Sequence, residues 1–166
     1  MKVTGPLRAF IAALVALPVA AAAQQPEAIM VAGETLVATV HAQGAQVYEC
    51  KADASGALTW HFREPVATLM SNGKTLGRHY AGPIWEFADG SALAAKVAAS
   101  APGASQSDIP LLKLAVVSQT GSGMLAGINS IQRLNTKGGV AKGPCDAAGT
   151  FLSVPYSADY AFYKKS

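Results

Sequence analysis

The sequence predicts an all-β domain, either an antiparallel sandwich or a barrel. Short segments in which apolar and polar residues alternate follow one another along the chain. Turn-forming pairs such as Asn72-Gly73 and Asp89-Gly90 separate these segments. No helical pattern alternates with them as crossover helices would, which argues against a parallel α/β fold.

Residues 1–23 are predicted to be a secretory signal peptide that is removed. A basic start and an apolar run lead to the small-residue pattern Ala21-x-Ala23, and polar residues follow. The uninterrupted apolar run is short for a membrane span of about 20 residues, so an uncleaved anchor is not favoured. We expect cleavage after Ala23, a single domain over residues 24–166 with no stable membrane span, and a periplasmic or secreted location.

The charge of the mature chain gives no indication of a nucleic-acid partner. Removal of Lys2 and Arg8 lowers the formal net charge from +3 to +1, and no cluster of Lys and Arg remains. The sequence gives no indication of the oligomeric state.

The two cysteines, Cys50 and Cys145, are predicted to form one disulfide, as is usual in an exported chain. The bridge would connect a strand that ends at Cys50 to the C-terminal region. It closes a loop of about 95 residues, which chain entropy associates with about 4–5 kcal/mol of stability. A redox or metal-binding thiol pair is the alternative, and the absence of C-x-x-C argues against it.

The strands follow from local patterns. In Ala57–Arg63, for example, apolar residues occupy one face and polar residues the other. Gln43-Gly44 and Ser55-Gly56 are expected to be turns. Ala92–Ser100 has helix-forming composition, but the Asp89-Gly90 turn before it favours a hairpin return strand. The other predicted strands are Leu36–His41, Ala45–Cys50, Leu111–Val117, Ser130–Asn135 and the aromatic segment Phe151–Lys164.

Residues 78–91, RHYAGPIWEFADGS, hold the densest group of chemically active side chains. A two-residue turn at Asp89-Gly90 would pair Phe87 with Ala92, Trp85 with Ala94 and Glu86 with Leu93. Glu86 would then lie among aliphatic neighbours. Burial there would raise its pKa unless a cation such as Arg78, His79 or Arg133 compensates.

This stretch supports two interpretations. Gly82-Pro83 bends the chain, so His79 and Tyr80 could converge with Trp85 and Glu86 into a small polar site that includes Arg133. The alternative is a structural hairpin in which Glu86 is half exposed or salt-bridged, because structural ion pairs also perturb titrating groups.

The strand SIQRLN offers a second group of candidates. On an extended strand Arg133 and Asn135 share one side, and Gln132 and Leu134 share the other. Arg133 and Asn135 could hold an anionic or sugar-like ligand, with Arg133 acting as a bidentate fork. They could equally anchor the loop that follows.

Metal and cofactor sites are not predicted. His41, His61 and His79 fall in separate strands without ligand spacing. The segment GSGMLAG, residues 121–127, misses the dinucleotide spacing G-x-G-x-x-G by one residue, and no helix follows it. No G-x-S-x-G elbow is present. The aromatic segment VPYSADYAFY is expected to close the β core, with an exposed binding platform as the alternative.

Several stretches in order resemble one exported bacterial and fungal family, the domain of unknown function 3455. They are AQVYEC, HYAGPIWEFADGS, IPLLKLAVV, SIQRLNTKGG and VPYSADYAFY. The resemblance covers residues 45–163 and implies an exported, single-domain protein. It supplies no catalytic residues. Where similar sequences have proline after the Ala of GGxA, this chain has Lys142 after Ala141.

Three functional hypotheses follow. The first is a non-enzymatic module that binds a small molecule, glycan or envelope component around His79, Tyr80, Trp85, Glu86, Arg133 and Asn135. The second is an exported hydrolase-like enzyme with Glu86 or His79 as general acid or base. The third is a structural or stress-related envelope protein without a pocket. A pocket that holds Glu86, His79 and Arg133 together would favour the first two, and dispersed side chains would favour the third.

Overall fold

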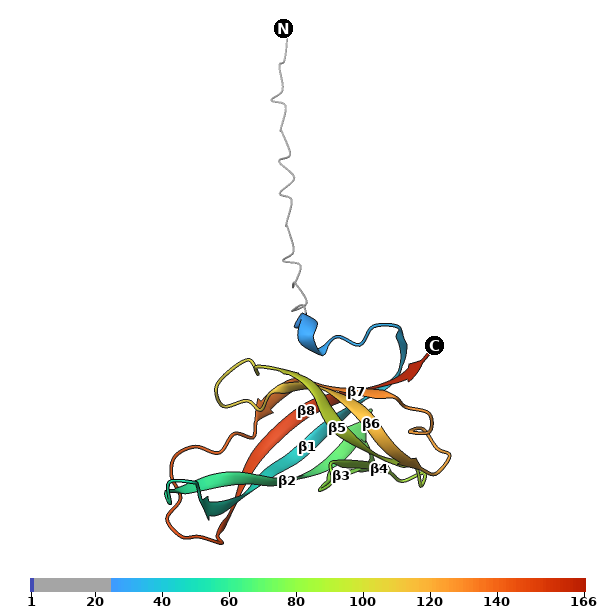
Figure 1. Ribbon diagram of the computed structural model, residues 1–166. Coiled ribbons are helices and arrows are strands. Elements are labelled where there is room, and N and C mark those ends of the chain that lie inside the picture. Colours follow the sequence, from blue (N-terminus) through green and yellow to red (C-terminus); the bar gives the residue numbers. More distant parts are fainter. Residues whose placement is uncertain (2–24) are drawn as a thin grey trace.

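The computed structural model describes residue 1 and residues 25–166, and here a single antiparallel sheet closes into a barrel (Figure 1). The barrel alternative of the predicted all-β fold is therefore correct. Residues 2–24, with the predicted cleavage after Ala23, lie outside the described residues. The described part holds no helix that is long and apolar enough to cross a membrane.

The strands follow one another around the barrel in chain order, and each pairs with its sequence neighbours. β8 closes the sheet by pairing with β1 from Glu34↔Lys165 to Glu49↔Phe151, so neither strand is left as an open edge. The elements are η1 (Glu27–Ile29), β1 (Glu34–Ala52), β2 (Leu58–Ser71), β3 (Lys74–Tyr80), β4 (Ile84–Phe87), β5 (Ala92–Ala101), β6 (Leu111–Thr120), β7 (Ser130–Gly138) and β8 (Phe151–Lys165).

Gln43-Gly44 is not the predicted turn, because β1 runs through it without interruption. Gly44 instead allows close approach to β2: a Cβ at this position would lie 2.0 Å from the carbonyl oxygen of Val66. Farther along β1 the register shifts at Val47/Tyr48. A glycine and a bulge let a long strand follow a strongly curved sheet.

The turns predicted at Asn72-Gly73 and Asp89-Gly90 are present, but the second is longer than expected. Asn72 and Gly73 both have positive φ, 50° and 73°, and join β2 to β3. After β4 the Phe87 amide donates to Ser91 O (2.8 Å), so Ala88 belongs to the loop together with Asp89-Gly90.

This longer loop changes the register that the sequence predicted. Trp85 pairs with Leu93 and Glu86 with Ala92, so the predicted pairing was wrong by one residue. Ala92–Ala101 forms strand β5, as the hairpin interpretation predicted and the helical composition did not.

One end of the barrel is filled by side chains. Trp85, Phe87, Tyr160 and Phe162 are buried there, with the rings of Phe87 and Phe162 5.9 Å apart. The loop between β6 and β7 adds buried aliphatic residues, Leu125 and Ile128, to the same core. The Met124 amide in this loop donates to Asp89 (2.7 Å), which ties the loop to the β4–β5 turn.

The predicted disulfide is present. Cys50 and Cys145 are bonded, with their Cα atoms 5.9 Å apart and both side chains buried. The bond joins the end of β1 to the segment between β7 and β8, at the end of the barrel opposite the Asn72-Gly73 and Asp89-Gly90 turns.

Gly44→Ala should lower the free energy of unfolding by about 2–3 kcal/mol, because the added methyl meets backbone atoms that have little room to move. Urea denaturation measures the change. Gly56→Ala is the control: its methyl meets no atom within 4 Å, and only the positive φ of 86° opposes it, at about 1 kcal/mol. Equal losses in the two variants would contradict the close approach at Gly44.

Replacing both Cys50 and Cys145 by Ser should lower the free energy of unfolding by about 4 kcal/mol, because the open chain regains the entropy of a loop that spans 95 positions. The same urea titration of the native protein, with and without reductant, provides the comparison. The serine variant should not respond to reductant. A native protein whose stability is also unchanged by complete reduction would rule out a stabilising bridge.

Candidate functional site

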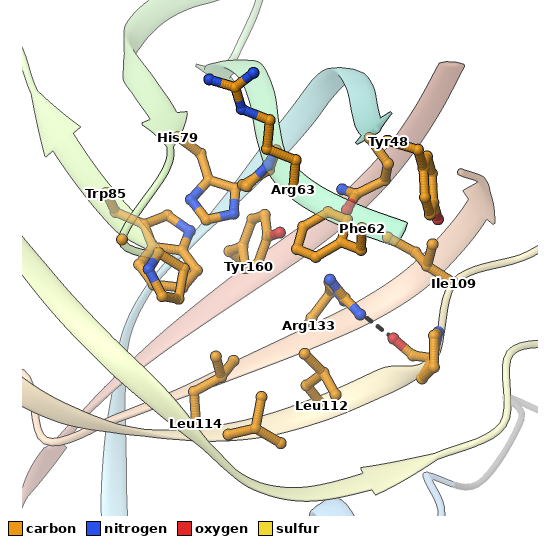
Figure 2. A pocket seen from close by; sticks show the side chains of 16 residues that line it. Tyr48, Phe62, Arg63, His79, Trp85, Ile109, Leu112, Leu114, Arg133 and Tyr160 are labelled. Carbon is orange, nitrogen blue, oxygen red and sulfur yellow. Dashed lines mark hydrogen bonds between the residues drawn. The ribbon is translucent and has the colours of Figure 1, made fainter. Parts of the chain in front are cut away.

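The half of the barrel that side chains do not fill contains a cavity of about 490 Å³ (Figure 2). The ends of the strands that lead to the disulfide end of the barrel form its walls. Most of its lining is aromatic or aliphatic, and the polar exceptions come from β1, β2, β3 and β7. The side chains that surround its centre include Tyr48, Phe62, His79, Trp85, Ile109, Leu112, Leu114, Arg133 and Tyr160.

The hairpin of β3 and β4 divides its polar residues between two sides of the barrel wall. His79 pairs with Trp85, and both side chains are buried inside the barrel. Arg78 pairs with Glu86 one position earlier, and these side chains point outward. Successive residues of a strand face opposite sides, so neighbours in sequence are separated here by the sheet itself.

Outside the barrel, Glu86 takes part in a compact cluster. One Arg78 nitrogen lies 3.1 Å from each Glu86 carboxylate oxygen, and the Tyr80 hydroxyl donates to one of them at 2.6 Å. The Tyr80 hydrogen bond, followed by Arg78, lowers the pKa of Glu86. Aliphatic neighbours such as Ile84 and Ala92 do lie near Glu86, but the hydrogen bonds from Tyr80 and Arg78 outweigh the effect of burial on its pKa. The structural interpretation of Glu86, a salt-bridged carboxylate, therefore describes it well.

The predicted polar site is thus only partly assembled. His79, Trp85 and Arg133 line the cavity, whereas Tyr80 and Glu86 lie on the outer surface. An acid–base pair made of His79 and Glu86 cannot face one substrate, because the barrel wall lies between them.

His79 is held as a neutral imidazole. Its ring stacks on Trp85 at 4.2 Å, and its Nδ1 lies 2.9 Å from the Ile84 carbonyl oxygen. A carbonyl accepts only, so Nδ1 carries the proton and Nε2 keeps its lone pair. Burial, with a smaller contribution from the charge of Arg133, lowers the pKa of His79 to about 4.

Arg133 brings a positive charge into the cavity. It lies on β7 between Leu112 of β6 and Tyr160 of β8, and its Nε donates to the Pro110 carbonyl at 3.0 Å. Figure 2 shows the guanidinium between Phe62, Tyr160 and Leu112. Arg133 therefore anchors the segment before β6, and not the loop after its own strand as one interpretation of the sequence held.

Asn135 does not share the side of Arg133. A register irregularity between Leu134 and Lys137 and a positive φ of 50° at Asn135 break the alternation that the sequence suggested. The exposed Asn135 amide instead donates to Asp159 (2.8 Å) on the outer surface.

The cavity also contains two polar side chains that the sequence analysis did not single out, Gln46 and Tyr160. Gln46 Nε2, Trp85 Nε1 and the Tyr160 hydroxyl are buried and have no hydrogen-bond partner within the described chain. The Tyr156 hydroxyl is likewise buried without a partner, although Tyr156 is not among the residues that line the cavity. Strand alternation could have identified these residues: Gln46 and Val47 face opposite sides of the sheet, and Tyr156 and Tyr160 are spaced to share one face. Unpartnered buried polar groups are rare and often indicate a place for water or a ligand.

No metal centre is arranged in the described residues: no group of three or more His, Cys, Asp or Glu side chains is positioned to hold an ion. His41 and His61 are exposed, and His41 pairs with Asp159 at 2.8 Å.

A family model described as a protein of unknown function (DUF3455) matches residues 31–164. The chain belongs to the DUF3455 family. The match begins before β1 and extends almost to the end of β8, so the family corresponds to the barrel. Searches of curated proteins and of solved structures gave no match. The family resemblance that the sequence motifs suggested is thereby confirmed.

Burial of His79 in its neutral form should make the protein less stable as the pH falls from about 7 to about 4. Its pKa of about 4 in the folded protein lies below the ordinary 6.5, so between these values only the unfolded chain binds the proton. The free energy of unfolding should lose about 3 kcal/mol from this group between pH 7 and pH 4. Urea titrations across this range measure it. His79→Gln should show a correspondingly shallower slope, and equal slopes would contradict the assignment.

Proposed function

We propose that this exported protein binds a small, mainly apolar molecule inside its barrel. The observation that carries the proposal is the cavity of about 490 Å³ in a barrel whose other end is densely packed. Sites for small molecules are typically concave, about 300–1,000 Å³ in volume and mostly apolar. The interior of an eight-stranded barrel is either filled by side chains or holds one small ligand.

The entrance to the cavity is suited to an apolar guest. Phe62 and Val97, two of the lining residues, keep 55% and 57% of their surface exposed. Large hydrophobic side chains at the rim of a pocket commonly mark a binding surface. A glycan is a less suitable ligand, because its many hydroxyl groups would lack partners against such walls.

Binding is favoured over hydrolysis by the chemistry of the same walls. No Asp or Glu is among the described residues that line the cavity, and Glu86 lies outside it. His79 is buried with one ring nitrogen already used by Ile84. A protein with only a structural role in the envelope would have no need of an interior space of this size.

Export is part of the proposal. The signal-like residues 1–23 suit secretion into the periplasm or medium. The Cys50–Cys145 bond is of the kind that persists in such oxidising surroundings.

The neutral apolar dye N-phenyl-1-naphthylamine should bind to the purified protein and gain fluorescence. Val97→Trp fills the cavity entrance, and Leu112→Trp fills the interior. Each should weaken dye binding by at least about tenfold, since the space for the dye is lost. A Trp60→Phe variant without either filling substitution keeps Trp85 as its remaining tryptophan. Binding of the dye should quench the fluorescence of Trp85 in this variant.

Glu86→Gln is the matched control, since it changes a side chain on the outer face of the wall and should leave dye affinity unchanged. Thermal unfolding of each variant verifies that it is folded, and Val97→Trp alters an already exposed site. Absence of dye binding, or equal binding by the native and filled proteins, would refute the proposal.

A further inference from the structure

The charge balance of the cavity identifies the class of molecule that it suits. Arg63 and Arg133 are the formal charges among its lining residues. Arg63 pairs with Glu64 at 3.2 Å, and Figure 2 shows its guanidinium directed away from the cavity. None of the ion pairs within the described chain includes Arg133. The interior of the barrel therefore carries a positive charge without a counter-ion.

We propose that the ligand is an apolar carboxylic acid whose carboxylate pairs with Arg133 and whose apolar body fills the aromatic part of the cavity. This inference rests on the proposed binding function and specifies its ligand. A half-buried guanidinium in apolar surroundings is costly when unpaired, and a bound anion would remove that cost.

The hydrogen-bonding state of Arg133 leaves it available for such an anion. Its Nε donates to the Pro110 carbonyl at 3.0 Å, and the guanidinium also interacts with the neighbouring Tyr160 hydroxyl. No carboxylate of the described chain pairs with the guanidinium, and paired guanidinium N–H groups match the two oxygens of a carboxylate. The Pro110 bond fixes the plane of the fork, so less side-chain freedom is lost when a ligand binds.

The surrounding groups contribute donors. The Tyr160 hydroxyl, the Trp85 indole N–H and the Gln46 side-chain amide are buried around the cavity without partners. Burial raises the pKa of Tyr160, and the charge of Arg133 together with hydrogen bonds to Tyr156 and Arg133 opposes this rise. An anion beside Arg133 would meet donors and no competing carboxylate.

A single negative charge fits this site better than a phosphate ester. One guanidinium supplies one positive charge, and no Lys is among the described residues lining the cavity. A doubly charged phosphate would be left partly unpaired in a mainly apolar space. The remaining lining, which includes Phe62, Leu112 and Leu114, suits a hydrocarbon or aromatic body.

Competition between two ligands of similar shape tests the inference. Decanoate and decanol are titrated against bound N-phenyl-1-naphthylamine at about pH 7.5, where the acid is ionised. Decanoate should displace the dye from the native protein at least about tenfold more effectively than decanol, since a charge-assisted hydrogen bond is worth at least this factor. Arg133→Met should abolish the difference and still bind the neutral dye.

Arg78→Met is the matched control. It removes an arginine from the adjoining outer surface of the same barrel, so the preference for decanoate should persist. Equal displacement by decanoate and decanol in the native protein would overturn the carboxylate assignment even if Arg133→Met does not fold. Dye binding would then still support the proposed function. Failure of the dye, decanoate and decanol to bind at all would refute both.

Discussion

Pairing between β1 and β8 closes the sheet, and whether a side chain of the described strands points into or out of the barrel depends on that closure. In a closed sheet one set of alternate residues must point to the interior and the other to the exterior. His79 and Trp85 are therefore buried, while Arg78 and Glu86, their immediate neighbours in sequence, meet on the outer surface. The same alternation directs Arg133 and Tyr160 inward from β7 and β8.

Side chains fill one end of the barrel interior, and the other end contains the cavity. Aromatic rings and the loop residues Leu125 and Ile128 fill one end. Toward the disulfide end the strands continue, but the side chains do not fill the space between them, which leaves the cavity. The packed end holds the His79–Trp85 stack in place, and the bond from Arg133 to Pro110 holds the opposite wall. A preorganised site of this kind binds without first having to order its walls.

Particular residues explain why the predicted site was only half right. The sequence correctly singled out His79, Trp85 and Arg133, because aromatic and charged side chains stand out in an otherwise apolar pattern. It grouped them with Tyr80, Glu86 and Asn135 because these are close in sequence. One extra residue in the loop after β4 shifts the register between β4 and β5. An irregularity after Leu134 turns Asn135 to the outer surface. Neither feature has a distinctive sequence signal.

By itself the sequence determined the all-β class, the family, the Cys50–Cys145 bond and the Asn72-Gly73 turn, because each rests on local pattern or on composition. It did not determine that Gly44 lies within a continuous strand, since the same glycine serves a turn or a close strand contact. Only the tertiary structure decided that the sheet closes, that Gln46, Tyr48 and Tyr160 share an interior with Arg133, and that Arg133 has no carboxylate beside it. These properties depend on pairing between strands far apart in the chain, which local alternation does not specify.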